Sequence, residues 1–396
     1  MNRRHDIDAL RALAFALVIL YHVAMYYVAG WHWHLKSPHE AEWLQWPMRA
    51  LNLWRMDLVF LISGLALGFL RPAAAARASL LGQRSWRLLL PLAFGMVVIV
   101  PYQAYAQAVG NGTIAPGFGA FLARYFTGGP WPRGAFDGSD PGVTWNHLWY
   151  LPYLWCYTAV VLLALPLLHS AVGRRLQASL LALRGWRLLI PILPLMAWSI
   201  LLRPSFPPTH DLLHDGWLHA VYFTLFLYGF WIGIDPAWWA EVTRLRWRWL
   251  AGAALLLASC LAWLWIWPAA SGPWRHAPRL LADAYLWTAL LAILAWGHRL
   301  LNRPWRWLPW ANEQVYPWYV LHQTLIIVLV VWLAPLRLAA PLEAALLVTG
   351  TITGCWTLTA IIRRTAWLRP LFGLKPRAPA RYPSPATPAS PAARSA

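Results

Sequence analysis

The hydrophobic positions of this chain gather into long runs that are bounded by charged residues, proline or glycine. Such runs approach or reach the length that a helix needs to cross the hydrocarbon core of a bilayer, about 20 residues. We therefore predict ten transmembrane helices, at 10–29, 50–70, 88–106, 147–168, 187–202, 217–234, 249–267, 280–298, 316–334 and 341–362. The predicted fold class is all-α, a polytopic integral membrane bundle.

The composition agrees with this pattern. Hydrophobic residues make up 60% of the 396 positions, which is more apolar surface than a soluble protein can bury. The first run is not followed by the small-residue cleavage site of a signal peptide, so we expect it to remain as the first span. The three cysteines lie in apolar segments without paired spacing, which predicts neither a disulfide framework nor a zinc site.

The basic residues are distributed in step with the predicted helices. Of the 33 Lys and Arg residues, 24 lie in the two termini and every second connection, and nine lie in the other connections. Because basic residues are enriched on the cytoplasmic side, we predict cytoplasmic termini and a multi-pass protein of the inner (cytoplasmic) membrane. The net charge of +19 then indicates contact with the lipid bilayer or an anionic cytoplasmic ligand, and we expect no nucleic-acid partner.

The chain divides into one large and one small region. We predict a transmembrane domain over 1–365 and a Pro- and Ala-rich cytoplasmic tail over 366–396, which has too few apolar residues to fold and should be disordered. One predicted outer connection, 107–146, is long and rich in Gly and Pro. A connection of this length is either a lid or binding surface, or a disordered segment.

The first predicted helix contains an unusual polar stripe. His22 is the one strongly polar side chain between Ala12 and Ala29, and Arg11 lies eleven residues before it, on the same helix face and about 16 Å away along the axis. Asp8 is one turn from Arg11 and can pair with it. Ionisable groups inside a membrane usually mark functional sites. The alternative is a pair of anchoring charges and a histidine that bonds a neighbouring helix.

These side chains suggest chemistry. Burial favours the neutral imidazole, which is the form that a general base needs to take a proton from an alcohol. Arg11 can bind a phosphate or carboxylate, or simply be held by Asp8. Arg84 and Arg87, three residues apart at the start of the third predicted span, can clamp a polyphosphate. Snorkelling to lipid is the alternative, and the same spacing recurs at 184–187.

Other predicted spans carry further candidates. Asp57 lies within the second apolar run and Arg55 near its outer end, while Ser63 and Gly64 allow close helix packing. In the ninth span, Tyr319 and His322 share one face, and His322 is either a second reactive group or an interhelical hydrogen-bond partner. The remaining candidates stand at the outer start of the fourth span and are His147 and Trp149.

The stretch Trp31-His-Trp-His34 invites a metal interpretation, because alternating histidines can share a ligand set. No cysteine or carboxylate has a spacing that completes such a site. Anchoring of the tryptophans at the outer membrane interface explains the stretch better, and we predict no metal.

Taken together, these motifs resemble the membrane-bound acyltransferase 3 family over residues 4–365. Arg11 and His22 match that family's arginine and histidine separated by ten residues. Arg84 and Arg87 match its Arg-x-x-Arg motif, and Tyr319 with His322 its late Tyr-x-x-His motif. The family's Ser-Gly-Phe motif is represented by 63–65, where Leu65 replaces the phenylalanine.

The resemblance implies transfer of an acyl group (succinyl or acetyl) from cytoplasmic acyl-coenzyme A to a hydroxyl of a periplasmic or cell-envelope glycan. Acyl-coenzyme A would be the donor substrate, with no bound cofactor. The implied roles are catalysis by His22 and Arg11 and support of Arg11 by Asp8. The coenzyme A phosphates would be bound by Arg11, Arg84 and Arg87. The substrate would be bound by Asp57, His147, Trp149, Tyr319 and His322.

A transporter or flippase is the competing interpretation, in which the same intramembrane charges carry protons or anions. The sequence shows no recognisable paired half-repeats with broken helices, the usual indication of alternating access. A purely structural scaffold leaves the buried ionisable stripe unexplained.

Overall fold

The computed structural model describes residues 4–233, 235–267, 274 and 276–376. Within these residues the protein is all-helical, and its one extended pairing is an isolated bridge between Val28 and Ala41. The α-helices are α1 (His5–Tyr27), α2 (Gln45–Asn52), α3 (Arg55–Phe69), α4 (Arg77–Phe94), α5 (Pro101–Gly110), α6 (Phe118–Phe126), α7 (Tyr150–Leu163), α8 (Leu165–Leu168), α9 (Ala171–Leu181), α10 (Ile192–Leu201), α11 (Gly216–Ile232), α12 (Pro236–Arg244), α13 (Arg246–Ile266), α14 (Ala277–Leu301), α15 (Leu308–Leu333), α16 (Ala340–Arg364) and α17 (Leu368–Leu371).

Short helical turns join several of these helices. The 3₁₀ turns are η1 (Glu42–Leu44), η2 (Ala74–Ala76), η4 (Asn146–Trp149), η5 (Gly185–Leu189) and η7 (Ala334–Leu336). A π-helical turn, η3 (Gly95–Ile99), continues α4 toward α5. The all-α class predicted from the hydrophobic runs is therefore confirmed.

Six helical stretches in the described part of the chain are long and apolar enough to cross a membrane. They are α1, Glu42–Phe69, α13, α14, Leu308–Leu336 and α16. Two bent pairs raise the number to eight if each pair is one span: Arg77–Ile99 with α5, bent by 41°, and α11 with α12, bent by 111°. The protein is thus a multi-pass helical membrane bundle.

All ten predicted apolar runs fall on helices, but two of these helices are shorter than a full span. The run 187–202 corresponds to the short apolar stretch Gly185–Leu201. The run 147–168 is interrupted at Ala164, between α7 and α8. Pro166 follows at once, and proline favours the first turn of a new helix because it has no amide hydrogen for the preceding turn.

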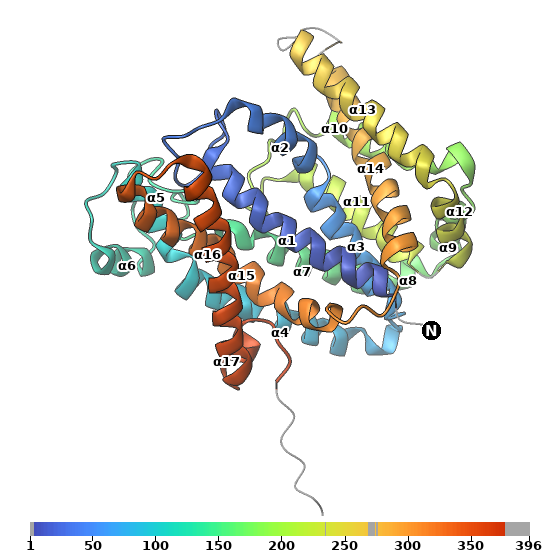
Figure 1. Cartoon of the computed structure of the whole chain (residues 1–396). Helices are drawn as coiled ribbons and strands as arrows, with labels where there is room; N and C mark the ends of the chain where they lie inside the picture. Colours follow the sequence, from blue (N-terminus) through green and yellow to red (C-terminus); the bar gives the residue numbers. More distant parts are fainter. Residues whose placement is uncertain (1–3, 234, 268–273, 275, 377–396) are drawn as a thin grey trace, which may run out of the picture.

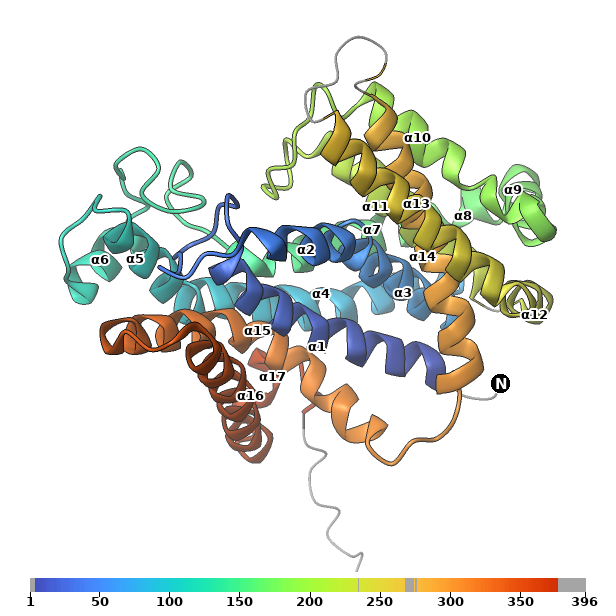
Figure 2. The ribbon, with the colours of Figure 1, turned by 45° about the horizontal axis from the view of Figure 1, so that its top comes forward.

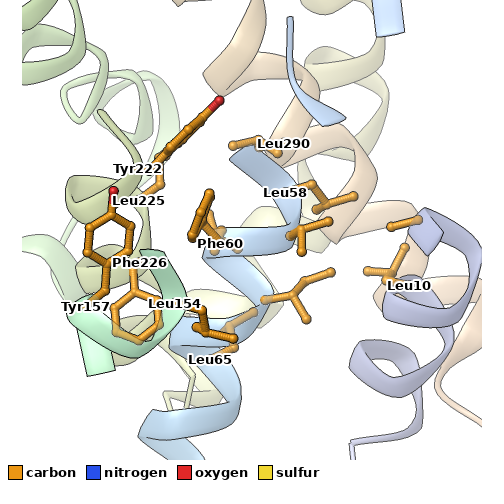
Figure 3. Close-up of a cluster of buried hydrophobic side chains, with 14 of the residues drawn as sticks. Leu10, Leu58, Phe60, Leu65, Leu154, Tyr157, Tyr222, Leu225, Phe226 and Leu290 are labelled. Carbon is orange, nitrogen blue, oxygen red and sulfur yellow. The ribbon is translucent and has the colours of Figure 1, made fainter. Parts of the chain in front are cut away.

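The core of the bundle is built around the close contact of α3 with α11. A Cβ atom on Gly64 would lie 1.9 Å from the carbonyl oxygen of Phe226, and one on Gly229 would lie 2.1 Å from that of Leu61. Phe60 of α3 stacks on Tyr222 of α11, with their ring centroids 4.5 Å apart. Figure 3 shows this cluster, with Phe60 between the two helices and Leu58 turned toward Leu10 of α1.

Helix α1 crosses the middle of the bundle, and its neighbours position the site described below. It packs against α3, α14 and α15. Figure 1 and Figure 2 both show α5, α6 and the 107–146 segment at the end of the bundle that the C-terminal end of α1 approaches. At the other end, Arg4 lies 3.3 Å from His298 Nδ1 of α14.

The predicted tail, 366–396, is described as far as residue 376. Its first part contains α17, which packs against α4 and α16. Arg369 of α17 lies 3.7 Å from a carboxylate oxygen of Glu313 on α15. The prediction of disorder for 377–396 lies outside the described residues.

Candidate active site

A cavity of about 40 Å³ lies beside the middle of α1. This is room for about three water molecules, or for a small group such as a hydroxyl and a carbonyl. Four parts of the chain contribute to its wall: α1, α3, the η4–α7 junction and α15. The lining residues are Phe15, Val18, His22, Arg55, Met56, Val59, His147, Trp149, Tyr150 and Tyr319.

His22 is held in the cavity wall by His322 of α15. Nδ1 of His22 lies 2.8 Å from Nε2 of His322, and the two rings stack with centroids 5.0 Å apart. Nδ1 of His322 lies 3.0 Å from the carbonyl oxygen of Trp318 and 2.9 Å from that of Tyr319. Because carbonyl oxygens only accept, Nδ1 of His322 carries the hydrogen, and its Nε2 accepts one from His22 Nδ1.

This arrangement leaves the lone pair of His22 on Nε2. Among the described residues, Nε2 of His22 has no hydrogen-bond partner, and the side chain lines the cavity. A neutral imidazole in this tautomer can accept a proton from a hydroxyl placed in the cavity. The interhelical hydrogen bond that the sequence offered as an alternative for His322 is therefore present, and it orients His22.

His147, the second histidine of the cavity wall, has both ring nitrogens engaged. Its Nε2 lies 3.2 Å from the carbonyl oxygen of Val320 and so donates, while its Nδ1 accepts from Nε2 of Gln103 at 3.2 Å. Its own carbonyl accepts from the Tyr319 hydroxyl at 2.6 Å. His147 cannot take a proton without losing a hydrogen bond, so His22 is the better base.

Tyr150 links the cavity to the small-residue motif of α3. Its hydroxyl lies 2.6 Å from Ser63 Oγ, which in turn donates to the carbonyl oxygen of Val59 at 2.8 Å. Since the serine hydroxyl has one hydrogen, Tyr150 is the donor to Ser63. Ser63 thus has a polar role in addition to the close packing made by Gly64, and the sequence did not single out Tyr150.

The predicted cationic site gathers at the N-terminal half of α1. Arg11 Nη2 donates to Oδ1 of Asp8 at 3.2 Å, so the predicted Asp8–Arg11 contact is present. It also donates to Oδ1 of Asn312 of α15 at 2.9 Å. Arg84 of α4 interacts electrostatically with Arg11, Arg87 and Tyr150. The structure therefore brings the arginines of separate motifs together, and Tyr150, with which Arg11 and Arg84 interact electrostatically, lines the same cavity as His22.

Asp57 is the predicted substrate-binding residue that the structure keeps away from the cavity. It lies two residues after Arg55, so the two side chains leave α3 on nearly opposite sides. Asp57 is buried and interacts electrostatically with Asp283 of α14. The other predicted substrate-side residues line the cavity (His147, Trp149 and Tyr319) or stand directly behind His22 (His322).

A chain of buried amides, which sequence reasoning missed, leads from His147 toward the 107–146 segment. Gln103 Oε1 accepts from Gln323 Nε2 at 3.0 Å, and the same Gln323 nitrogen lies 2.8 Å from His34 Nε2. His34 Nδ1 then donates to Gln107 Oε1 at 2.7 Å. The signal available in the sequence was the presence of glutamines inside apolar runs, where an unpaired amide would be costly.

Through His34, the Trp31–His34 stretch is part of this chain of buried amides, and it is not only an aromatic anchor at the membrane interface. His34 is buried, and burial lowers the pKa of its imidazole, although nearby Asp137 and the bond to Gln107 act in the opposite direction. Its neighbour His32 is more exposed and lies 3.1 Å from Asp137 of the 107–146 segment. Within the described residues, no group of three or more His, Cys, Asp or Glu side chains could hold a metal ion.

The fold and this site define an α-helical membrane protein with ionisable side chains around a cavity inside the bundle. A family model described as an acyltransferase domain matches residues 4–360. The chain belongs to the acyltransferase 3 family, and it is an acyltransferase that works on an acyl donor and an acceptor at the bilayer. Comparison with curated proteins and with solved structures gave no match.

Proposed function

We propose that the protein is an O-acyltransferase of the inner membrane that moves an acyl group from cytoplasmic acyl-coenzyme A to a hydroxyl of a periplasmic or cell-envelope glycan. The observation that carries this proposal is that Nε2 of His22 has no hydrogen-bond partner among the described residues, while the His22 side chain lines a cavity together with Tyr150, which interacts electrostatically with Arg11 and Arg84. A base in this cavity can take the proton of an acceptor hydroxyl that enters from the outer side while the acyl donor approaches from the cytoplasmic side.

The choice of acceptor class rests on a finer resemblance. Four stretches are similar to glucans biosynthesis protein C, an enzyme associated with succinylation of periplasmic glucans. They are 5–11 (HDIDALR), 33–37 (WHLKS), 58–64 (LVFLISG) and 147–151 (HLWYL). This similarity favours a succinyl group and a glucan, with an acetyl group as the alternative.

The donor is held through its phosphates in this proposal. Coenzyme A carries several phosphate charges, and arginine binds phosphate with paired, charge-assisted hydrogen bonds. Arg11, Arg84 and Arg87 supply these bonds at the cytoplasmic side. Arg84 interacts electrostatically with both Arg11 and Arg87. These like charges repel one another, and a shared anionic ligand would offset the repulsion.

The reaction follows from the tautomer of His22. Nε2 of His22 takes the proton of the acceptor hydroxyl while the hydroxyl oxygen attacks the thioester carbonyl carbon, whose π electrons move to the carbonyl oxygen. The tetrahedral intermediate then re-forms the carbonyl and breaks the carbon–sulfur bond. The coenzyme A thiolate recovers the proton from His22, so the products are an ester and a thiol.

The experiment compares the parent protein with His22→Ala in vesicles that receive labelled acyl-coenzyme A and a glucan acceptor. Removal of the base is expected to lower acceptor labelling by at least about 10²-fold. His214→Ala is the matched control, because His214 is exposed and bonds Asp211 outside the cavity. Full activity of His22→Ala would exclude His22 as the base. Movement of substrate without thioester cleavage would show a transporter instead.

A further inference from the structure

Arg55, the first residue of α3, is a buried cation in the wall of the cavity that contains His22. Its exposed fraction is 7%. Its guanidinium carbon lies 3.4 Å from the ring centroid of Tyr21, so the planar group rests on the aromatic face. Tyr21 itself is fixed by a 3.1 Å hydrogen bond from its hydroxyl to Asn52. Tyr21, the residue before His22 in the sequence, therefore holds the guanidinium in a defined orientation.

Within the described residues, two nitrogens of the guanidinium lack the hydrogen-bond acceptors that a buried charge usually has. Among the described residues, neither Nε nor Nη1 of Arg55 has a hydrogen-bond partner, and Asp57 acts on the guanidinium only through a longer-range electrostatic interaction. Asp57 leaves α3 on the other side, as shown above. Removing a charge from water without such acceptors is unfavourable. A group kept in this state is prepared to receive a negatively charged oxygen.

Three other polar groups of the cavity wall already use their hydrogens within the protein. The hydroxyl of Tyr150 donates to Ser63, the hydroxyl of Tyr319 donates to the carbonyl of His147, and Nε2 of His147 donates to the carbonyl of Val320. Nε and Nη1 of Arg55 thus carry hydrogens that no acceptor among the described residues uses. Its place next to His22, away from the cationic cluster around Arg11, fits the reacting carbonyl rather than the coenzyme A phosphates.

Resting on the proposed function, we propose that Arg55 is a catalytic residue that binds the thioester oxygen as this oxygen becomes negatively charged. When the hydroxyl oxygen attacks, the carbonyl π electrons move onto that oxygen, and the Arg55 hydrogens stabilise the new charge. When the carbon–sulfur bond breaks, the electrons return and the contact weakens. A fixed donor in a buried site stabilises such a charge without having to reorganise.

The test is the kinetics of Arg55→Met in vesicles, with labelled acyl-coenzyme A and a glucan acceptor. Removal of one donor to such an oxygen lowers kcat by about 10²- to 10³-fold, whereas the KM for acyl-coenzyme A should stay within about threefold of the parent. Arg49→Met is the matched control, since Arg49 of α2 bonds Gln45 outside the cavity. A kcat equal to that of the parent would overturn the assignment, and so would a loss of kcat/KM that comes from a higher KM alone.

Two further measurements separate this inference from folding and from the proposed function. Free guanidinium should restore part of the kcat of Arg55→Ala, an effect that a purely structural role cannot produce. If neither variant accumulates as folded protein, Arg55→Lys decides: its less suitable geometry should lower kcat about tenfold or more at unchanged KM, and parent kinetics would overturn the proposal. A parent protein without acyl transfer refutes the proposed function itself. An inactive His22→Ala beside a fully active Arg55→Met refutes only the role of Arg55.

Discussion

His322 determines which nitrogen of His22 holds the lone pair, and this role can be tested by substitution. In His322→Phe the acceptor for Nδ1 of His22 is lost, so the ring can adopt the other tautomer or rotate. We expect kcat to fall by about tenfold or more, short of the loss in His22→Ala. His322→Gln, whose amide oxygen can accept the same hydrogen, should retain more activity than His322→Phe.

The measurement is the initial rate of acceptor labelling for both variants, together with His39→Phe as a control. His39 is exposed, its Nε2 lies 3.0 Å from the carbonyl oxygen of Leu338, and neither residue lines the cavity. Equal activity of His322→Phe and the parent would show that the contact with His22 does not fix its protonation state.

Individual site residues were predictable from the sequence where the relation was local. The spacing of Asp8 and Arg11 predicted a contact that the structure contains. The pairing of His22 with His322 was not predictable, because it joins residues 300 positions apart and depends on which helices are neighbours. The sequence indicates Arg55 as a charge near a span end, but the absence of hydrogen-bond acceptors for its Nε and Nη1 among the described residues depends on how the bundle packs.

At the scale of helices, the contact of α3 with α11 depends on glycine. A Cβ atom on Gly64 would lie within 3.0 Å of three backbone atoms of α11, and backbone cannot move aside as a side chain can. We expect Gly64→Ala to destabilise the protein by about 1–3 kcal/mol or more, since the two helices must separate. The measurement is the midpoint of thermal unfolding in detergent.

Gly82→Ala in α4 is the matched control for this prediction. A Cβ atom at Gly82 meets nothing within 4 Å, and alanine has the higher helix propensity, by about 1 kcal/mol. The control should therefore unfold at or above the temperature of the parent. If both variants unfolded at the same temperature, the close approach at Gly64 would not contribute to stability.

The positions of the helices were predictable because long apolar runs have few alternatives in a membrane. The breaks within them were not. Pro166 stands at the break between α7 and α8, yet proline also occurs inside α4 as Pro91 and inside α15 as Pro317, where the helix continues. Asp235 caps the N-terminus of α12, because its side chain accepts a hydrogen bond from the Trp238 amide. The apolar pattern does not reveal this contact.

At the scale of the whole molecule, the charge distribution predicts an orientation with which the contacts agree. Side chains from predicted outer connections meet one another, as His32 meets Asp137 and the Trp145 indole donates to the carbonyl of His210. At the opposite end, Arg363 of α16 lies 2.8 Å from Glu313 at the start of α15. The order of helices around α1 could not be predicted from one sequence, because every apolar face can pack against any other.

Cysteine labelling tests this orientation directly. Starting from a variant in which Cys156, Cys260 and Cys355 are replaced by alanine, we would introduce Asp140→Cys or Arg306→Cys, since both positions are exposed in the described structure. In intact spheroplasts, a membrane-impermeant maleimide should label Asp140→Cys and leave Arg306→Cys unlabelled until the membrane is disrupted. The reverse pattern would place Arg11, Arg84 and Arg87 on the periplasmic side. Cytoplasmic acyl-coenzyme A could not reach them there, so the proposed path of the acyl group depends on this result.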